Sequence, residues 1–169
     1  MDVVSHGLWG GLAFGRTSKK YYWLSFLFGV LPDVLSFGLL MIANILNIGT
    51  KVSWSEAPTN ADIPIYVHVL YNITHSLVIF AVVFSTVWLI RKRPFLPLLA
   101  WPFHIVLDIF THTTAFFATP FLWPLFSYKF NGISWGHPWI FFPNWIAIII
   151  GYSIWYIKRK RSLKEKAIS

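Results

Sequence analysis

Residues 94–128, PFLPLLAWPFHIVLDIFTHTTAFFATPFLWPLFSY, decide the fold class of this chain. Among Asp, Glu, Lys and Arg the stretch contains only Asp108, and it exceeds the roughly 20 apolar residues with which a helix spans a bilayer. Three further stretches have the same character. They are residues 21–50, in which Asp33 is the only such residue, 63–90 and 130–157. The sequence therefore predicts an integral membrane protein.

The composition supports this class. Hydrophobic residues make up 56% of the 169 residues and charged residues only 12%, compared with about 25% charged residues in typical soluble domains. The mean hydropathy is +0.60. These values exclude a disordered chain, a coiled coil and an ordinary soluble enzyme. Because the chain has no Cys, a metal has to bind here to His, Asp, Glu or backbone oxygen atoms.

We expect an all-α integral membrane protein that forms a single membrane domain over residues 1–169. The four apolar stretches predict four transmembrane helices, and the short apolar segment 1–15 predicts a further N-terminal helix that crosses only half of the bilayer. The expected spans cover approximately residues 21–48, 63–90, 95–118 and 139–157, and a basic tail follows at 158–169.

The basic residues predict the orientation. All but Lys51 and Lys129 of the fourteen Lys and Arg residues lie in three clusters, at 16–20, 91–93 and 158–166, which four spans would place on one side. Because cytoplasmic loops carry the excess of Lys and Arg, we expect a cytoplasmic C-terminus. The basic tail then contacts lipid headgroups, and we expect membrane lipids rather than nucleic acid as partners. The side of the N-terminus and the oligomeric state stay open.

An aromatic segment follows the third expected span. Residues 116–145 are rich in Phe, Trp and Tyr, and Trp and Tyr favour the membrane interface. Asn131-Gly132 separates two short apolar runs within it, a pattern typical of a tight hairpin turn. We expect either a hairpin flap on the outer face or a plain interfacial aromatic belt.

The third expected span carries a polar stripe. Ionisable residues within spans are costly and usually functional. His104, Asp108 and His112 are spaced four residues apart, so they share one stripe of a helix. A His and an Asp one turn apart make a good chelating pair, because their side chains lie one above the other.

The first two expected spans carry polar residues as well. His68, Asn72 and His75 share one face of the second helix. In the first, Asp33 directly follows Pro32, which we expect to break or kink the helix and to aim Asp33 into the bundle.

These groups lie at matched depth. At about 1.5 Å per residue, Asp33 lies roughly 18 Å, Asp108 roughly 21 Å and His75 roughly 22 Å from the cytoplasmic end of its span. All three therefore fall in one slab near the midplane. His6, roughly 15 Å deep in a helix, reaches the lower edge of this slab.

Imidazole and carboxylate groups are ligands of zinc, and also of iron or manganese. The sequence predicts a divalent metal site, with zinc as the expected ion and with the ligands His75, His104, Asp108 and His112. Asp33 and His6 are the expected catalytic residues. Side chains that support the ligands are expected from His68, Asn72, Thr74 and Thr111, although His68 and His112 can each be either ligand or support. Interhelical hydrogen bonds without a metal are the alternative.

Five short motifs follow one another in a fixed order. They read Ser5-His6-Gly7, Leu31-Pro32-Asp33, Thr74-His75-Ser76, His104-Ile-Val-Leu-Asp108-Ile-Phe-Thr111 and Leu122-Trp123-Pro124. In order and spacing, from residue 6 to about residue 136, the chain resembles the LexA-regulated inner-membrane family of metal-dependent hydrolases. The resemblance implies a metal-dependent hydrolase in a bacterial-type inner (plasma) membrane, and it names no substrate.

The chain departs from the family pattern at two motifs. Leu35 stands where the family has a second Asp, and Leu70-Tyr71-Asn72 stands where it has His-Arg-Gly. The departures remove up to two ligands and one cation. They leave open whether one or two metals bind, and the missing Arg weakens the case for a phosphate substrate.

Two functions of different classes remain. The first is a membrane-embedded hydrolase that cleaves a lipid or lipid-linked ester or phosphoester with water activated by the metal. The second is a metal-ion or proton transporter or channel that uses the same His and Asp residues, although no inverted repeat is visible in the sequence. A structural membrane protein with a bound metal is a third option.

Overall fold

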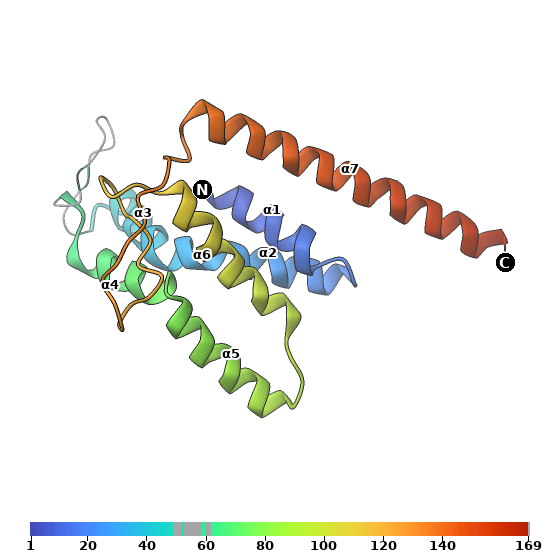
Figure 1. The fold of residues 1–169 in the computed structure, drawn as a ribbon, viewed down its shortest axis with the longest axis horizontal. Coiled ribbons are helices and arrows are strands. Elements are labelled where there is room, and N and C mark those ends of the chain that lie inside the picture. The colour runs from blue at the N-terminus through green and yellow to red at the C-terminus, as the bar shows by residue number, and fades with distance from the viewer. Residues whose placement is uncertain (49–51, 53–58, 60–61, 169) are drawn as a thin grey trace.

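The computed structural model describes residues 1–48, 52, 59 and 62–168, and all regular elements in these ranges are helical (Figure 1). The elements are α1 (Val3–Phe14), α2 (Lys19–Asp33), the π-helical η1 (Val34–Gly38), α3 (Leu39–Ile45), α4 (Ile65–Thr74), α5 (Leu77–Arg91), the 3₁₀ turn η3 (Leu96–Leu99), α6 (Ala100–Thr111) and α7 (Pro138–Ile168). Thr113 and Phe116 form one isolated bridge, and the described ranges contain no strand. The expected all-α fold class is confirmed.

The number of membrane spans differs from the expectation of four. In the described ranges two helical stretches are long and apolar enough to cross a membrane, Lys19–Ile45 and Pro138–Ser162. The pair α4 and α5 is a third candidate if its bend is counted within one span. The expected span 95–118 is helical only over 96–111, which is shorter than a span, as is α1. Two or three apolar helices therefore suggest membrane insertion.

Glycines allow α1 and α2 to pack with their backbones in contact. A Cβ atom on Gly29 of α2 would lie 2.5 Å from the carbonyl oxygen of His6, and one on Gly10 would lie 2.6 Å from that of Ser25. Small residues at such contacts are typical of helix pairs in membranes. The close packing holds the start of α1, with His6, against the middle of the first long helix.

The first long helix does not break at Pro32, although a break was one of the two outcomes expected there. Pro32 lies within α2, and the chain continues through η1 into α3. Proline removes one backbone donor, and the wider π turn that follows keeps the chain helical. The hydroxyl of Ser36 donates to the carbonyl oxygen of Pro32 at 2.9 Å, which satisfies an acceptor in this turn. Asp33 therefore points inward from a continuous helix.

The second expected span does break, between α4 and α5. The two helices meet at 55°. Ser76 begins α5, because its hydroxyl accepts hydrogen bonds from the amides of Val78 and Ile79, each at 3.1 Å. His75 ends α4. An N-capping serine inside an apolar stretch thus places a histidine at the bend.

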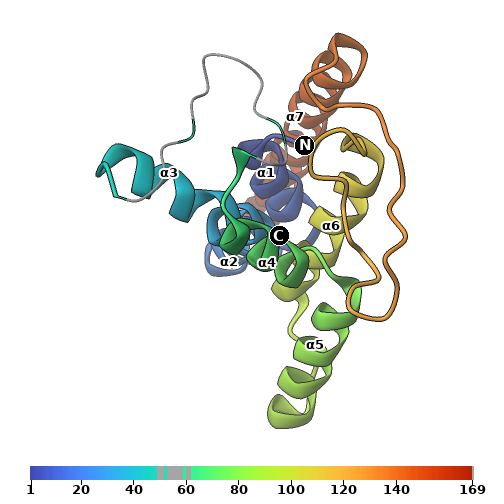
Figure 2. The ribbon, with the colours of Figure 1, turned by 90° about the vertical axis from the view of Figure 1, so that its left-hand side faces the viewer.

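The aromatic segment after α6 packs against the end of that helix instead of forming a hairpin (Figure 2). Three backbone hydrogen bonds join the two, from Gly132 to His112 (2.9 Å), from Ile133 to Phe110 (3.0 Å) and from Trp135 to Thr111 (2.9 Å). The last carbonyl groups of a helix have no partner within it, and this segment supplies their donors. The hairpin prediction is wrong. Asn131 also lacks the positive φ that a type I′ turn requires.

The long helix α7 is joined to α1 by polar side chains. Asn144 accepts from the indole of Trp9 and donates to the hydroxyl of Ser5, each at 2.8 Å. The hydroxyl of Tyr152 donates to the carbonyl oxygen of Leu8 at 2.8 Å. The basic tail continues α7 as helix to Ile168.

In Figure 1 the α1–α2 connection and the C-terminal end of α7 lie to the right of the segment after α6, and the α5–η3 connection lies near the bottom of the view. The cytoplasmic side of the C-terminus stays a prediction.

Candidate metal centre

Four buried side chains converge where α2, the α4–α5 bend and α6 meet. They are Asp33, His75, His104 and Asp108, and one ligand atom of each lies within 4.8 Å of the others. Asp33 ends α2, His75 lies at the bend, and His104 and Asp108 are one turn apart on α6. This group could hold a metal ion.

The ligand atoms have the spacing of a metal shell. Nε2 of His75 and Nε2 of His104 are 3.0 Å apart. Oδ2 of Asp108 lies 3.2 Å from His104 Nε2 and 3.5 Å from His75 Nε2. Oδ1 of Asp33 lies 3.5 Å from His75 Nε2 and 3.8 Å from His104 Nε2. Neighbouring ligands of a tetrahedral zinc ion, with bonds of about 2.0–2.1 Å, are about 3.3 Å apart, a value that these five distances bracket.

Backbone carbonyl groups orient the two histidine rings. Nδ1 of His104 donates to the carbonyl oxygen of Gly29 at 2.7 Å, and Nδ1 of His75 donates to that of Tyr71 at 3.2 Å. Since a carbonyl oxygen only accepts, Nδ1 of His104 carries the proton and its Nε2 presents a lone pair, and His75 has the same tautomer when its Nδ1 donates to Tyr71. Metal-bound histidines typically donate from their other nitrogen in this way. Two lone pairs that face each other require a cation or a proton between them.

One oxygen of each carboxylate in the group has no hydrogen-bond donor among the described residues. Oδ2 of Asp33 and Oδ2 of Asp108 are buried, and neither has a hydrogen-bond donor among the described residues. Burying an unpaired anionic oxygen is costly. A divalent cation among the ligand atoms would compensate Oδ2 of Asp108, which lies within 3.5 Å of both Nε2 atoms. Two imidazoles and two carboxylates therefore fit a divalent metal such as zinc.

The second oxygen of Asp108 has other neighbours. His6 Nε2 lies 2.8 Å from Oδ1, and the Met1 nitrogen donates to the same atom. The His6 ring stacks on His104, with centroids 3.7 Å apart. His112 Nε2 lies 3.6 Å from Oδ1. The expected catalytic residue His6 and the expected ligand His112 thus lie beside Asp108 but outside the four-residue group.

Two of the four expected supporting residues contact a ligand. The hydroxyl of Thr74 lies 3.0 Å from His75 Nδ1, and that of Thr111 donates to Asp108 Oδ1 at 3.4 Å. His68 and Asn72 line a separate cavity instead.

Tyr71 is a site residue that the sequence analysis did not select. Its ring stacks on His75, with centroids 3.8 Å apart, and its hydroxyl donates to the carbonyl oxygen of Phe117 at 2.9 Å. The same hydroxyl lies 3.0 Å from His112 Nδ1. The one feature of the sequence that could have indicated Tyr71 is its position in the second-span motif, where the family that the chain resembles has Arg. Gly29 was also not selected, because no sequence pattern marks a backbone carbonyl as a partner of His104.

A cavity of about 370 Å³ lies beside the group. Asp33 lines it, whereas the other three members of the group do not. Most of its remaining wall is apolar, formed by residues such as Phe37, Met41, Phe116 and Trp135. Trp135 belongs to the aromatic segment after α6, which therefore covers part of the cavity.

Comparison with protein-family models, with curated proteins and with solved structures finds no match in any of the three. The function is therefore inferred from the geometry of the site, alongside the resemblance in the motifs.

Proposed function

We propose that this protein is a membrane-embedded, metal-dependent hydrolase that acts on a lipid or lipid-linked ester or phosphoester. One observation carries the proposal. Asp33 belongs both to the four-residue group and to the wall of a mostly apolar cavity. A metal held by this group would act beside a space suited to hydrocarbon. The resemblance to the LexA-regulated inner-membrane hydrolases supports the same activity and a bacterial-type inner membrane.

The metal ligands in this proposal are His75, His104 and Asp108, and the ion is zinc. Catalytic zinc sites commonly have three protein ligands and one open position. An ion held by these residues would act as a Lewis acid and would allow water to ionise near pH 7. The carbonyl groups of Gly29 and Tyr71 hold the two imidazoles in the tautomer that binds metal.

Asp33 is the proposed general base. Its Oδ1 faces His75 and His104, and its Oδ2 has no donor among the described residues. A carboxylate at the border of the cavity can take a proton from an attacking water. His6 acts through Asp108, because its Nε2 lies 2.8 Å from Asp108 Oδ1 and it does not line the cavity.

Transport of metal ions or protons is the second candidate, and one observation favours it. Close polar contacts lead from His75 to Asp108, on to His112 and then to the hydroxyl of Tyr71. Series of intramembrane His and Asp residues serve as ion or proton pathways in transporters.

The test uses purified protein in lipid nanodiscs and proteoliposomes. We expect turnover of fluorescent lipid esters or phosphoesters that is lost with a chelator, restored by zinc and absent in His104→Ala. A proteoliposome assay of zinc and proton flux is run in parallel. Metal-loaded protein that moves zinc or protons and hydrolyses neither substrate class would overturn the hydrolase and support transport.

A further inference from the structure

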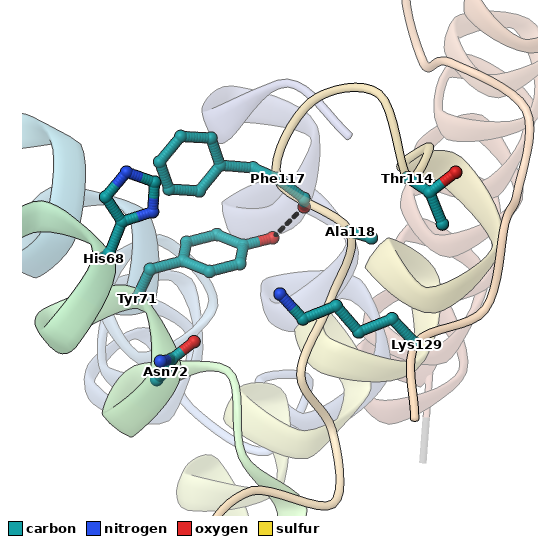
Figure 3. Close-up of a pocket in the computed structure, with 7 residues that line it drawn as sticks. All are labelled: His68, Tyr71, Asn72, Thr114, Phe117, Ala118 and Lys129. Carbon is teal, nitrogen blue, oxygen red and sulfur yellow. Dashed lines mark hydrogen bonds between the residues drawn. The ribbon is translucent and has the colours of Figure 1, made fainter. Parts of the chain in front are cut away.

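A second cavity, of about 260 Å³, lies next to Tyr71 (Figure 3). Its wall includes His68, Tyr71, Asn72, Thr114, Phe117 and Lys129. Among the described residues of the wall, Lys129 is the one that carries a charge, and none of them is a carboxylate. In Figure 3 the ammonium end of Lys129 points into the space bordered by Tyr71 and Asn72. Within this described part of the wall a cation and an amide face a common space, and this combination favours an anion.

Backbone contacts near Lys129 fix this arrangement. The side-chain oxygen of Asn131 accepts from the amide of Thr114 at 2.9 Å and from its hydroxyl at 3.0 Å. The Gly132 amide donates to His112 at 2.9 Å. The segment that carries Lys129 is therefore tied to the chain after α6 at positions two and three residues further on. These hydrogen bonds hold the backbone beside Lys129 and so keep Lys129 at the cavity.

Tyr71 separates this cavity from the metal group. Its ring stacks on His75, and none of the four converging residues lines the smaller cavity. Phe117, by contrast, lines both cavities. An anion at Lys129 would thus be held for recognition, while another part of the same molecule passes Phe117 and reaches Asp33.

We propose that the smaller cavity binds the phosphate group of an anionic phospholipid through Lys129 and Asn72, while a hydrocarbon chain lies in the larger cavity. This deepens, and rests on, the proposed hydrolase function. The bond presented to Asp33 is then a carboxylic ester. Water adds its oxygen to the acyl carbon, the carbon–oxygen bond of the ester breaks, and the released alcohol oxygen takes the proton, so that the phosphate ester stays intact. Charge-assisted contacts of phosphate with Lys are strong enough to select such a headgroup.

The experiment compares the binding of short-chain phosphatidic acid with that of diacylglycerol of the same chain length, by calorimetry on zinc-loaded protein. We expect wild type to prefer phosphatidic acid, and Lys129→Met to lower that preference about tenfold or more, since a hydrogen bond to a charged group is lost. Lys129→Arg should keep the preference. Lys158→Met, which removes the same charge from the exposed end of α7, is the matched control and should keep it too.

Three outcomes would overturn the headgroup site. They are an unchanged preference in Lys129→Met, an equal loss in Lys158→Met, and inorganic phosphate that displaces phosphatidic acid at equal affinity, which would indicate a site for free phosphate. Zinc content and ester hydrolysis are measured on the same samples. A preference for phosphatidic acid without ester hydrolysis would contradict the hydrolase function and support the headgroup site. Ester hydrolysis without that preference would support the hydrolase function and contradict the headgroup site.

Discussion

Nε2 of His75 and Nε2 of His104 face each other across 3.0 Å, while Nδ1 of each ring donates to a backbone carbonyl. Helix α6 and the α4–α5 bend bring the two rings together from positions far apart in the sequence. Asp108 Oδ2 lies within 3.5 Å of both nitrogens. Lone pairs and carboxylate oxygens thus converge without a donor, an arrangement that a cation stabilises.

Purified protein should therefore carry about one tightly bound transition metal per chain, with zinc expected. His104→Ala or Asp108→Ala should abolish binding, because each removes a ligand from a set with few spares. His137→Ala, which changes an exposed histidine outside the group, should keep full occupancy. Elemental analysis by mass spectrometry measures the content. Full occupancy in either ligand variant would refute the metal centre.

Asp33→Asn should separate catalysis from binding. Asn is nearly isosteric with Asp but takes no proton at neutral pH, and loss of a general base typically costs about 10²–10⁴-fold in rate. We expect hydrolysis to fall by this factor while the metal stays bound by His75, His104 and Asp108. The rate and the metal content are measured on one preparation. Loss of the metal would make Asp33 a ligand rather than the base, and wild-type turnover would remove it from catalysis.

Gly132→Ala should destabilise the cover formed by the aromatic segment. A Cβ atom at Gly132 would lie 2.3 Å from the carbonyl oxygen of Phe110, a backbone atom that cannot move away independently. Overpacking of this kind typically costs about 1–3 kcal/mol. Thermal unfolding in detergent should show a lower Tm for this variant. Gly136→Ala is the matched control, because its Cβ would lie 3.9 Å from the hydroxyl oxygen of Ser134, which is an ordinary contact. Equal Tm values for both variants would contradict the close approach.

A reporter fused after Ser169 should be active only if it works in the cytosol. The prediction follows from the clusters of Lys and Arg at 16–20, 91–93 and 158–166, which favour the cytoplasmic side. The same reporters inserted at the α5–η3 connection should give the same answer. Activity of an extracytoplasmic reporter at the C-terminus would reverse the orientation.

Helical spacing and depth from the basic ends were sufficient to select the residues that converge. Both are backbone properties, and they hold for His104 and Asp108 on α6 and for Asp33 on the first long helix. They do not report where a helix ends. The stripe argument for His112 assumes that α6 continues past Thr111, but His112 has extended backbone angles (φ −117°, ψ 150°), and its Nδ1 instead donates to Phe117 at 2.9 Å.

Because the end of a helix cannot be predicted from spacing, the expected number of spans and the expected hairpin also differ from the structure. The expected span rests on the lack of charged residues, and residues 112–118 contain no Asp, Glu, Lys or Arg but are not helical. Their course depends on amides that arrive from residues 132–135, and such non-local partners leave no periodic pattern in the sequence. The pair Asn131-Gly132 is typical of a hairpin turn, but the amide of Gly132 donates to the carbonyl oxygen of His112 at the end of α6. This partner is distant in the sequence, so the pattern does not predict it.

Gly29 has a consequence for how this protein can vary. Its carbonyl oxygen accepts from His104 Nδ1, and its missing side chain leaves room for the backbone of His6. A saturation scan should therefore find this glycine as intolerant as the histidines themselves, although it offers no atom to a metal. Larger side chains at Gly10 or Gly29 would displace the backbone of the partner helix, so tolerated changes in α1 and α2 are expected away from this contact.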